Sequence, residues 1–422
     1  MDAHKQLTIG LFGFGVVGEG LYKVMHQTPS LNATIKKICI KHPGKKRNAP
    51  EELFTTEKDD LLNDPDINVI VEVIDDSAAA FQIVSKAIRN GKAVVSASKK
   101  MLAEHLAEVL EMQQTTGEPF LYEAAACASI PVIRNLEEYY DNDLLHSMKA
   151  IVNGSTNFIL TKMFEEKLDF KQALILAQQL GFAESNPTLD VDGYDAVNKW
   201  TLLLAHAYGI IENPNNIVFT GIQNIQSGDA LVAKEKNFHI KLVAQAQKLL
   251  NGKVAAFVLP QFIKNDDHLA FVRNEYNGVV IESGFADKQF FYGKGAGSFP
   301  TASAVLSDIS ALRYQYRYEY KKLYHHHPHE LSHDFYVKVY ISFDDLKYIP
   351  RESFEWVEEW HAMEERKYLV GVLPFRELAE KTWWRENNNS LILTPEPVIE
   401  DVEIRKLKKK SLELAGLFEW NN

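Results

Sequence analysis

Short continuous apolar runs and amphipathic stretches alternate over the first 135 residues. Continuous apolar runs of about four to eight residues predict buried strands, and apolar residues at i, i+3 and i+4 predict helices. The predicted strands are 7–14, 35–40, 67–74, 93–96 and 120–125, and the predicted helices are 16–26, 79–90 and 102–116. This alternation predicts an α/β fold with a doubly wound parallel sheet.

The pattern changes after this region. Helices are predicted at 170–180 and 194–208, and strands at 255–259, 269–272 and 279–283. Helices that are followed by strands, instead of alternating with them, are typical of an α+β domain with helices on one side of a sheet. A polar, histidine-rich stretch at 324–333 predicts a linker. Beyond it, strands are predicted at 335–341, 367–375 and 390–393, and helices at 353–363 and 376–385.

Composition narrows the class of protein. The chain has 422 residues, 46% hydrophobic and 24% charged, which is typical of a folded protein with more than one core. A net charge of −11 disfavours nucleic acid as a partner. No signal peptide and no apolar run of about 18 residues is present, so we expect no membrane span and a cytoplasmic location. Cys39 and Cys127 lie in apolar stretches and are expected to be buried free thiols.

A glycine-rich turn joins the first predicted strand to the first predicted helix. Gly13, Gly15 and Gly18 have the spacing G-x-G-x-x-G, and Phe14, Val16 and Val17 lie between them. The glycines allow a tight turn, backbone approach to a pyrophosphate, and close packing of helix on strand. The helix N-terminus then offers free N–H groups to phosphate. The turn predicts a dinucleotide site in a Rossmann-type domain, although a simple strand–helix turn can have the same spacing.

The loop after the second predicted strand is basic. Lys41, His42, Lys45, Lys46 and Arg47 occur before any carboxylate. NAD-preferring sites usually place an acidic residue here for the ribose hydroxyls, whereas positive charge accommodates a 2′-phosphate. The loop therefore favours NADP over NAD, with Lys41 as a candidate cofactor-binding residue. A solvated basic loop is the alternative.

Acidic residues and a lysine gather around the start of the predicted helix 194–208. Glu184, Asp190 and Asp195 precede Lys199, and the last two residues are four apart on one helix face. A lysine held among acids beside an apolar run can exchange a proton with an alcohol oxygen. A solvated ion pair would have the same spacing. Lys99 follows the strand 93–96 at the edge where ligands of open α/β sheets collect, although a charged loop would also place it there.

Two further stretches are polar or rich in glycine. Residues 153–157 read Asn-Gly-Ser-Thr-Asn between apolar segments, and residues 293–297 read Gly-Lys-Gly-Ala-Gly before a predicted helix. Both are compatible with anion binding and with a simple turn of the chain.

Together these blocks resemble the homoserine dehydrogenase family, in order, across about residues 7–315. The quoted blocks are Gly10–Gly18, Val94–Lys99, Asn153–Leu160, the set Glu184, Pro187, Asp190, Gly193, Asp195 and Lys199, and the set Gly293, Gly295, Gly297 and Thr301–Ser303. The resemblance implies an NAD(P)-dependent oxidoreductase that interconverts L-homoserine and L-aspartate 4-semialdehyde in threonine and methionine biosynthesis. It also implies a homodimer.

The resemblance also implies roles for individual residues. Lys199 and Lys99 match the lysines that transfer the proton and hold the substrate hydroxyl, and Glu184 and Asp190 match acids that bind the substrate, chiefly its amino group. The other candidates are Asp195, Asn153, Gly154 and Ser155 for the substrate, Gly295 with Lys99 on the cofactor side, and Glu123, Ala126 and Ala128 for a monovalent cation, Na⁺ or K⁺.

The chain departs from the family pattern at several positions. Asp75 and Asp76 replace two glycines, and Ser98 replaces an asparagine before Lys99. Cys127-Ala128-Ser129 replaces the glycine-rich cation loop, Lys41-His42 replaces an Arg-Asp pair, and Lys294 replaces a proline. These changes motivate an alternative of another class, a dinucleotide-binding sensor or scaffold with impaired catalysis.

The expected organisation has three units. They are a Rossmann-type domain at 1–135, to which a helix near 300–315 returns, an α+β catalytic and dimerisation domain at 136–320, and a small α+β domain at 334–422. The last has a predicted strand–helix–strand–helix–strand order, loosely similar to regulatory modules of relatives. Residues 342–346 contain no glycine at the expected ligand turn, so a dimerising or stabilising role is favoured over feedback by threonine.

Overall fold

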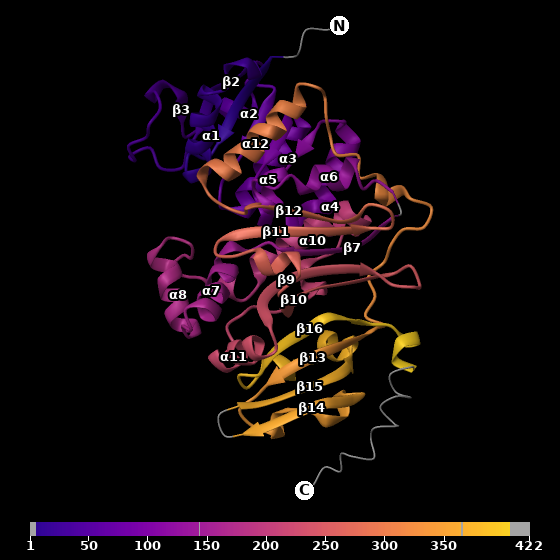
Figure 1. Cartoon of the computed structure of the whole chain (residues 1–422). Helices are drawn as coiled ribbons and strands as arrows, with labels where there is room; N and C mark the ends of the chain where they lie inside the picture. The colour runs from indigo at the N-terminus through magenta and orange to yellow at the C-terminus, as the bar shows by residue number, and fades with distance from the viewer. Residues whose placement is uncertain (1–5, 143, 364–365, 406–422) are drawn as a thin grey trace.

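The computed structural model describes residues 6–142, 144–363 and 366–405. The parts of the predicted first and last domains at 1–5, 364–365 and 406–422 lie outside the described residues. Figure 1 shows an elongated molecule with the N-terminal sheet at one end and the C-terminal strands at the other.

The N-terminal sheet is parallel throughout, with the order β3-β2-β1-β4-β5-β6. Its strands are β1 (Leu7–Phe12), β2 (Ala33–Cys39), β3 (Phe54–Thr55), β4 (Val69–Glu72), β5 (Ala93–Ser96) and β6 (Phe120–Leu121). Apolar side chains of β1 and β4 such as Leu11 and Ile70 are fully buried, because helices cover both faces of the sheet. This order confirms the predicted doubly wound fold.

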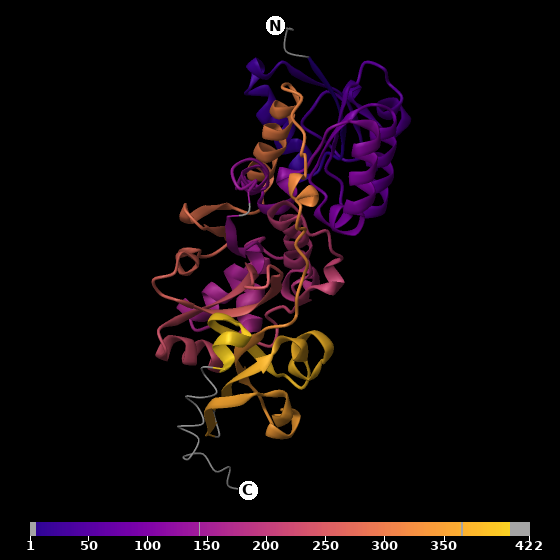
Figure 2. The same ribbon diagram turned by 90° about the vertical axis from the view of Figure 1, so that its right-hand side faces the viewer.

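Helices pack on this sheet, and one of them comes from far along the chain. They are α1 (Val16–His26), α2 (Asp59–Leu62), α3 (Ser77–Arg89), α4 (Lys99–Thr116) and α12 (Ser298–Leu312). α12 lies against α1, as Figures 1 and 2 both show, and Ser298 Oγ donates to Val16 O at 2.7 Å. A Cβ at Gly20 would lie 2.5 Å from Ser298 Oγ, so only a glycine permits this approach.

A second sheet of ten strands runs through the rest of the molecule, with the order β12-β11-β7-β9-β10-β16-β13-β15-β14 and β8 beside β10. Its strands are β7 (Leu145–Ile151), β8 (Val218–Phe219), β9 (Phe238–Lys248), β10 (Val254–Lys264), β11 (Tyr276–Ser283), β12 (Asp287–Lys294), β13 (Tyr336–Ser342), β14 (Trp356–Met363), β15 (Arg366–Pro374) and β16 (Ser390–Ile399).

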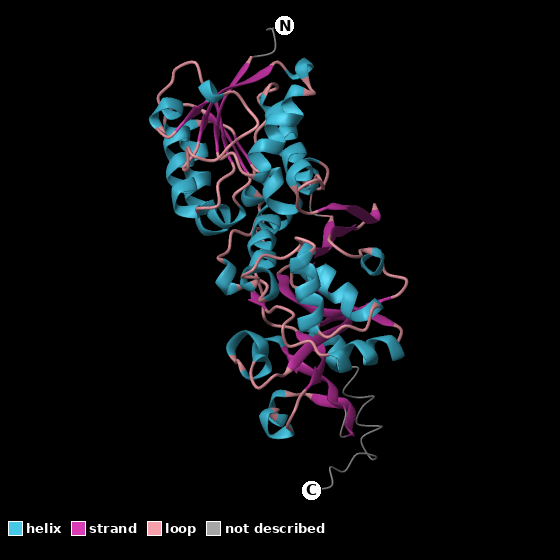
Figure 3. Ribbon diagram, turned by 90° about the vertical axis from the view of Figure 1, so that its left-hand side faces the viewer, coloured by secondary structure: helices cyan, strands magenta, loops and turns pink. Residues whose placement is uncertain are grey.

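Helix α10 (Tyr194–Tyr208) joins the two sheets. Trp200, Leu202 and Leu203 are fully buried, and α10 packs against α4, α5 and α6 as well as β9 and β10. The remaining helices are α5 (Glu123–Cys127), α6 (Val132–Glu138), α7 (Gly154–Glu165), α8 (Phe170–Gln179), α9 (Thr188–Val191), α11 (Ser227–Glu235) and α13 (Phe375–Glu380). Figure 3, coloured by secondary structure, shows helices beside the strands in both the upper and the lower part of the molecule. Lys199 of α10 therefore lies at the junction of the two sheets.

One predicted element is too long, and two others are of the wrong type. The predicted strand 120–125 ends at Leu121, and α5 begins at Glu123, whose N–H binds the carboxylate of Asp308 at 2.9 Å. The predicted strand 269–272 is a 3₁₀ turn (His268–Phe271), because the side chain of Asp267 caps the N–H of Leu269 at 2.8 Å. The predicted helix 353–363 is largely strand β14, which pairs antiparallel with β15. Cross-strand packing overrides the helix propensity of its Glu and Ala residues.

The order of helices and strands along the C-terminal region differs from the predicted order. Because 356–363 is a strand, the order is strand–strand–strand–helix–strand. The predicted helix 376–385 is α13 followed by a 3₁₀ turn (Trp383–Arg385). β16 joins β10 through the pair Gln261 and Leu393, and Phe257 and Leu259 of β10 share a core with β13 and β16.

Two expectations from composition can be compared with the structure. Cys39 and Cys127 are both buried free thiols, which confirms that prediction. Within the described ranges, every helix is too short or too polar to cross a membrane.

Candidate active site

Two lysines bind the same buried carboxylate at the junction of the sheets. Asp195 lies in the first turn of α10, and Lys199 follows one turn later. Lys199 Nζ lies 2.7 Å from Asp195 Oδ2, and Lys99 Nζ, from the first residue of α4, lies 2.6 Å from Asp195 Oδ1. The side chains of Lys199 and Asp195 are 7% and 4% exposed, whereas that of Lys99 is 46% exposed. Lys99 thus forms the solvent-facing side of the cluster.

The charges of the acids and lysines in this cluster stabilise one another. Burial alone would raise the pKa of Asp195, but the attraction of Lys199 and Lys99 outweighs it and holds the pKa below its ordinary range. The attraction of Asp195 raises the pKa of Lys99 against the opposing effect of burial, and the charges of Asp190 and Glu184 add to this increase. At neutral pH the Lys99 ammonium and the Asp195 carboxylate are therefore both charged.

Asn153 connects this cluster to Asp190. Its Oδ1 accepts from Thr156 N at 2.8 Å and caps the N-terminus of α7. Its Nδ2 donates to Asp190 Oδ1 at 2.7 Å and to Asp195 Oδ2 at 2.8 Å. The stretch 153–157, which was compatible with a simple turn, is thus the cap and first turn of a helix.

Asn277 is a site residue that the sequence did not indicate. Its Nδ2 donates to Val152 O at 3.0 Å, and Lys199 Nζ donates to the same oxygen at 2.9 Å. A Cβ at Gly295 would lie 1.8 Å from Asn277 Nδ2, so the glycine-rich loop can pack here only with glycine at that position. A single asparagine in an apolar strand has no motif that would have identified it.

The other predicted substrate-side residues lie around this cluster. Ser155 Oγ donates to Phe182 O at 2.6 Å and anchors the segment that leads to Glu184, whose side chain is exposed. Gly154 packs on the backbone at Glu275, because a Cβ at residue 154 would lie 2.5 Å from Glu275 O.

The predicted dinucleotide turn has the required geometry. Gly13 has φ +97°, and a Cβ at Gly18 would lie 2.2 Å from Gly13 O. A Cβ at Gly15 would meet nothing within 4 Å, so the backbone there is open to a ligand. Val16 and Val17 begin α1, and Phe14 packs edge-on against Phe54. The turn follows β1, Lys99 follows β5, and β4 lies between them, so both lie at the carboxyl edge of one sheet.

The basic loop after β2 is held together by one arginine. Arg47 donates to His42 O and to Lys45 O, the latter at 2.7 Å, and its guanidinium lies 5.5 Å from the Phe54 ring centroid. Lys41 is exposed at the start of this loop. Among the described residues, Lys41 forms no hydrogen bond or ion pair with the Lys99–Asp195–Lys199 cluster.

The two acidic departures from the family pattern differ in their contacts. Asp76 Oδ1 accepts from Ala79 N at 3.0 Å and caps α3. Asp75 is exposed at the end of β4. Ser98 is the N-cap residue of α4 and provides no side-chain cap. Asp76 therefore has a local structural role, whereas Asp75 has none that is visible.

The candidate cation ligands lie at α5. Glu123 accepts from Ile133 N at 2.8 Å and from Arg134 N at 3.0 Å, and thereby caps α6. Burial, and then the neighbouring Asp308, raise the pKa of Glu123 to about 7. Ala126 lies within α5, and Ala128 follows it with φ +43°. Glu123 has no direct contact with either lysine among the described residues.

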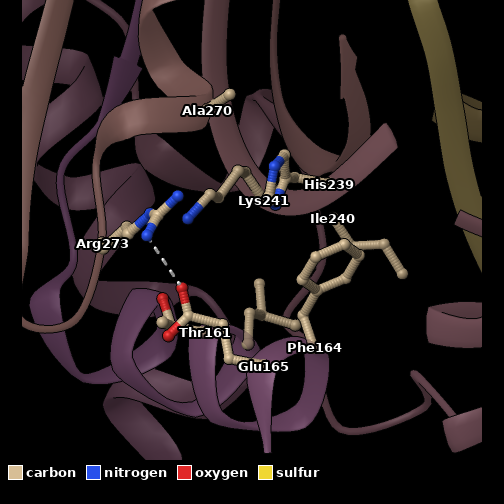
Figure 4. Close-up of a pocket in the computed structure, with 9 residues that line it drawn as sticks. Thr161, Phe164, Glu165, His239, Ile240, Lys241, Ala270 and Arg273 are labelled. Carbon is tan, nitrogen blue, oxygen red and sulfur yellow. Dashed lines mark ion pairs between the residues drawn. The ribbon is translucent and has the colours of Figure 1, made fainter. Parts of the chain in front are cut away.

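A small cavity lies apart from these residues, between α7 and β9. Figure 4 shows Lys241 and Arg273 pointing into it from one side, with Thr161 and Glu165 opposite. Lys241 Nζ donates to Asn157 Oδ1 at 2.9 Å and to Val272 O at 2.6 Å, and Arg273 pairs with Glu165 at 3.4 Å. The cavity has room for about one water molecule, too little for a dinucleotide or an amino acid.

Comparisons with known proteins agree with this geometry. The family model for the homoserine dehydrogenase domain matches residues 131–310, and the model for the homoserine dehydrogenase NAD binding domain matches residues 13–123. The homoserine dehydrogenase of Bacillus subtilis is 37% identical over 317 residues, which are 73% of each chain. That of Synechocystis is 35% identical over 311 residues, which are 71% of this chain and 72% of the relative.

Solved structures of homoserine dehydrogenases are similar to this chain in fold. A homoserine dehydrogenase from Thiobacillus denitrificans superposes with a TM-score of 0.79 at 26% identity, covering 93% of this chain and 98% of that one. A hyperthermophilic archaeal homoserine dehydrogenase in complex with NADPH superposes with a TM-score of 0.62 at 26% identity, covering 74% of this chain and 99% of that one. With two family models, relatives above 30% identity and a shared fold, the chain belongs to the homoserine dehydrogenase family.

Proposed function

We propose that this chain interconverts L-homoserine and L-aspartate 4-semialdehyde with a nicotinamide dinucleotide, as a step in threonine and methionine biosynthesis. The observation that carries the proposal is the pair of lysines on one buried carboxylate, Lys99–Asp195–Lys199, at the carboxyl edge of the dinucleotide-binding sheet. Such an arrangement places the side-chain nitrogens of two lysines where an alcohol or aldehyde oxygen can be held.

Different residues of the chain bind the substrate and transfer the proton. Lys199 uses two of its donors on Asp195 and Val152 O, which leaves one for the substrate oxygen. It gives a proton to the aldehyde oxygen during reduction and accepts one from the alcohol during oxidation. Lys99 holds the same oxygen, and Asp190 and Glu184 bind the ammonium of the amino acid. A bound nicotinamide dinucleotide would supply the hydride for reduction of the aldehyde and take it up in oxidation of the alcohol.

NADP is the cofactor that we propose, with NAD as a weaker ligand. The glycine turn fits a pyrophosphate, and the basic loop at Lys41 fits a 2′-phosphate. The archaeal relative solved with NADPH supports this choice. Lys41→Ala is expected to weaken NADPH binding several-fold and to leave NADH binding unchanged, as measured by fluorescence titration with each cofactor. Equal effects on both would contradict a role at the 2′-phosphate.

We also propose a monovalent cation at Glu123, with carbonyls of Ala126 and Ala128 as further ligands. Glu123 is a buried carboxylate beside a second one, Asp308, and Arg134 is the neighbouring cation. A bound cation would add positive charge beside these two acids, which supports the proposal. Na⁺ or K⁺ is expected to raise activity relative to choline chloride at equal ionic strength, and Glu123→Gln to remove that difference.

We propose a homodimer as the assembled form. Exposed aromatic side chains around the β11–β12 hairpin, such as Phe285 at 88% and Tyr292 at 50%, support an interaction surface there. Light scattering after size exclusion is expected to give twice the chain mass of 48.0 kDa.

The test of the proposed function is an absorbance assay at about 340 nm with homoserine and NADP or NAD, which follows formation of the reduced nicotinamide. Homoserine-dependent turnover is expected with at least one cofactor. Cofactor binding without turnover would instead support the alternative that Asp75, Asp76 and Ser98 motivated, a dinucleotide-binding sensor.

A further inference from the structure

Glu72 is a buried carboxyl group between two loops that border the site. It is the last residue of β4, and it is 0% exposed. Its Oε1 accepts from Ile74 N at 2.7 Å, and its Oε2 accepts from Ser96 Oγ at 2.6 Å. Among the described residues, Asp75 is the charged group that acts on it, and no cation compensates its charge. An apolar residue would fill this position at a lower energetic cost.

One oxygen of Glu72 fixes the backbone that leads to Lys99. Ser96 is the last residue of β5, and its Oγ also accepts from Ser98 N at 3.1 Å. Ala97 N donates to Glu72 O at 3.1 Å, and Lys99 N donates to Ala97 O at 3.1 Å. The whole segment between β5 and α4 is thus attached to residue 72.

The other oxygen fixes the backbone that meets the glycine turn. Ile74 N binds Glu72 Oε1, and Val73 N donates to Phe12 O at 3.0 Å. A Cβ at Gly13 would lie 2.8 Å from Val73 O, so this loop is in contact with the turn. Because β4 lies between β1 and β5, Glu72 contacts both the loop that meets the turn and the loop that leads to Lys99.

The protonation of Glu72 changes this arrangement. Burial raises the pKa of Glu72 to about 7, the hydrogen bonds from Ser96 and Ile74 oppose that shift, and the charge of Asp75 adds to it. The ionised group accepts from both loops. The protonated group carries one hydrogen of its own, so the bond to Ser96 or to Ile74 must reverse or weaken.

We propose that Glu72 is a positioning residue for the reaction, which in its ionised form holds Lys99 at a fixed distance from the dinucleotide turn through Ser96 and Ile74. This inference rests on the proposed function. If the wild-type chain does not turn over homoserine, the proposed function fails before any variant is compared.

The test is Glu72→Gln, which preserves the shape and the acceptor for Ile74 N but cannot ionise. We expect kcat for homoserine to fall about 10-fold, while the Kd of NADPH and the KM for homoserine change less than twofold. Between about pH 5.5 and 8.5, the wild-type kcat is expected to rise through an ionisation near neutrality that the variant lacks. A variant with wild-type kcat and an unchanged pH profile, or with a lower melting temperature alone, overturns the proposal.

Ser96→Ala provides a second test if Glu72→Gln does not fold. Removing a hydrogen bond that lowers the pKa of Glu72 is expected to move the ionisation in the kcat profile to higher pH. When Glu72→Gln does fold, the double variant Glu72→Gln/Ser96→Ala is expected to lose no more activity than the worse single variant, because both act through one contact. Additive losses in kcat, or an unmoved ionisation in Ser96→Ala, contradict the proposal.

Asp229→Asn is the matched control. Asp229 is also a buried carboxyl group whose pKa is raised by burial, but it binds Tyr340 OH at 2.9 Å beside the C-terminal strands. The kcat profile of this variant is expected to match that of the wild type. The same loss of ionisation in Asp229→Asn would mean that the profile reports general stability, which contradicts the role of Glu72.

Discussion

At the scale of single residues, the site depends on one buried carboxylate that serves two lysines. Lys199→Met removes one ammonium and keeps much of the side-chain length, so Asp195 retains Lys99 as its one charged partner. We expect kcat to fall at least about 100-fold, because proton transfer loses its donor, while the Kd of NADPH changes less than twofold. Lys100→Met is the control, since Lys100 is 56% exposed and pairs weakly with Glu104 at 3.8 Å. Substantial activity in Lys199→Met would remove this lysine from the mechanism.

We expect the unusual acid at residue 75 to affect binding of the cofactor rather than the fold. Asp75 is exposed at the end of β4, whereas Asp76 caps α3, so the two adjacent acids can be tested separately. Asp75→Asn removes a negative charge from the edge of the sheet at which we propose that the pyrophosphate binds. We expect NADPH to bind about 2- to 5-fold more tightly at low ionic strength, with a smaller gain at high salt. Fluorescence titration of Asp75→Asn and Asp76→Asn measures this difference, and equal effects of the two variants would contradict it.

At the scale of elements, hydrophobic periodicity predicted the helices and strands whose structure is determined by their own side chains. The parallel strands around β1 and β4 and the apolar helix α10 follow directly from their burial. Strand β14 could not be predicted in this way, because its structure depends on antiparallel pairing with a separate segment, β15, and not on the periodicity of its own residues. The candidate site shows the same division. Glu184, Asp190, Asp195 and Lys199 lie in one spaced block, but Asn277 reaches Val152 only through the pairing of β11 with β7.

Asn153 both caps helix α7 and contacts the acids of the candidate site. Substitutions at this residue can separate the two roles. Asn153→Asp keeps the acceptor for Thr156 N but replaces the donor to Asp190 and Asp195 with a third carboxylate. We expect this variant to keep the cap and to lose at least about 10-fold in kcat/KM, because like charges meet in the site. Asn153→Ala loses the cap as well, which is expected to lower the free energy of unfolding by about 1–2 kcal/mol. Urea denaturation and the homoserine assay on both variants distinguish these effects, and full activity in Asn153→Asp would contradict the role of the amide.

At the scale of the whole molecule, late segments of the chain connect the parts. α12 returns to α1, and the segment after it places Lys322 against two other elements, since its Nζ donates to Leu136 O at 2.9 Å and to His206 O at 2.8 Å. β16 then joins the C-terminal strands to β10. Family models match residues 13–123 and 131–310, whereas the solved relative from Thiobacillus denitrificans covers 93% of the chain. The shared fold therefore extends past residue 310, where the matched family models end, into the C-terminal strands.

The stability of the whole molecule should depend on pH through its buried lysines, and Lys241 is the clearest case. Burial lowers the pKa of Lys241 from 10.5 to about 7, and among the described residues no carboxylate lies within ion-pair distance. In the unfolded chain this lysine stays protonated up to about pH 10.5, so between the two pKa values unfolding takes up one proton. The unfavourable effect of burying Lys241 is therefore greatest below pH 7 and decreases as the pH rises.

Lys241→Met tests this dependence, because methionine fills a similar volume without a charge. From pH 7 to 9, the free energy of unfolding of the wild type is expected to rise by about 1–2.5 kcal/mol relative to that of the variant. Urea denaturation at several pH values measures the difference. Lys264→Met serves as the control, since Lys264 is 49% exposed and pairs with Glu396 at the surface. Parallel stability curves for wild type and Lys241→Met would show that Lys241 carries the same charge in the folded and unfolded chain, in which case its two hydrogen bonds in the cavity compensate the burial of an ammonium group.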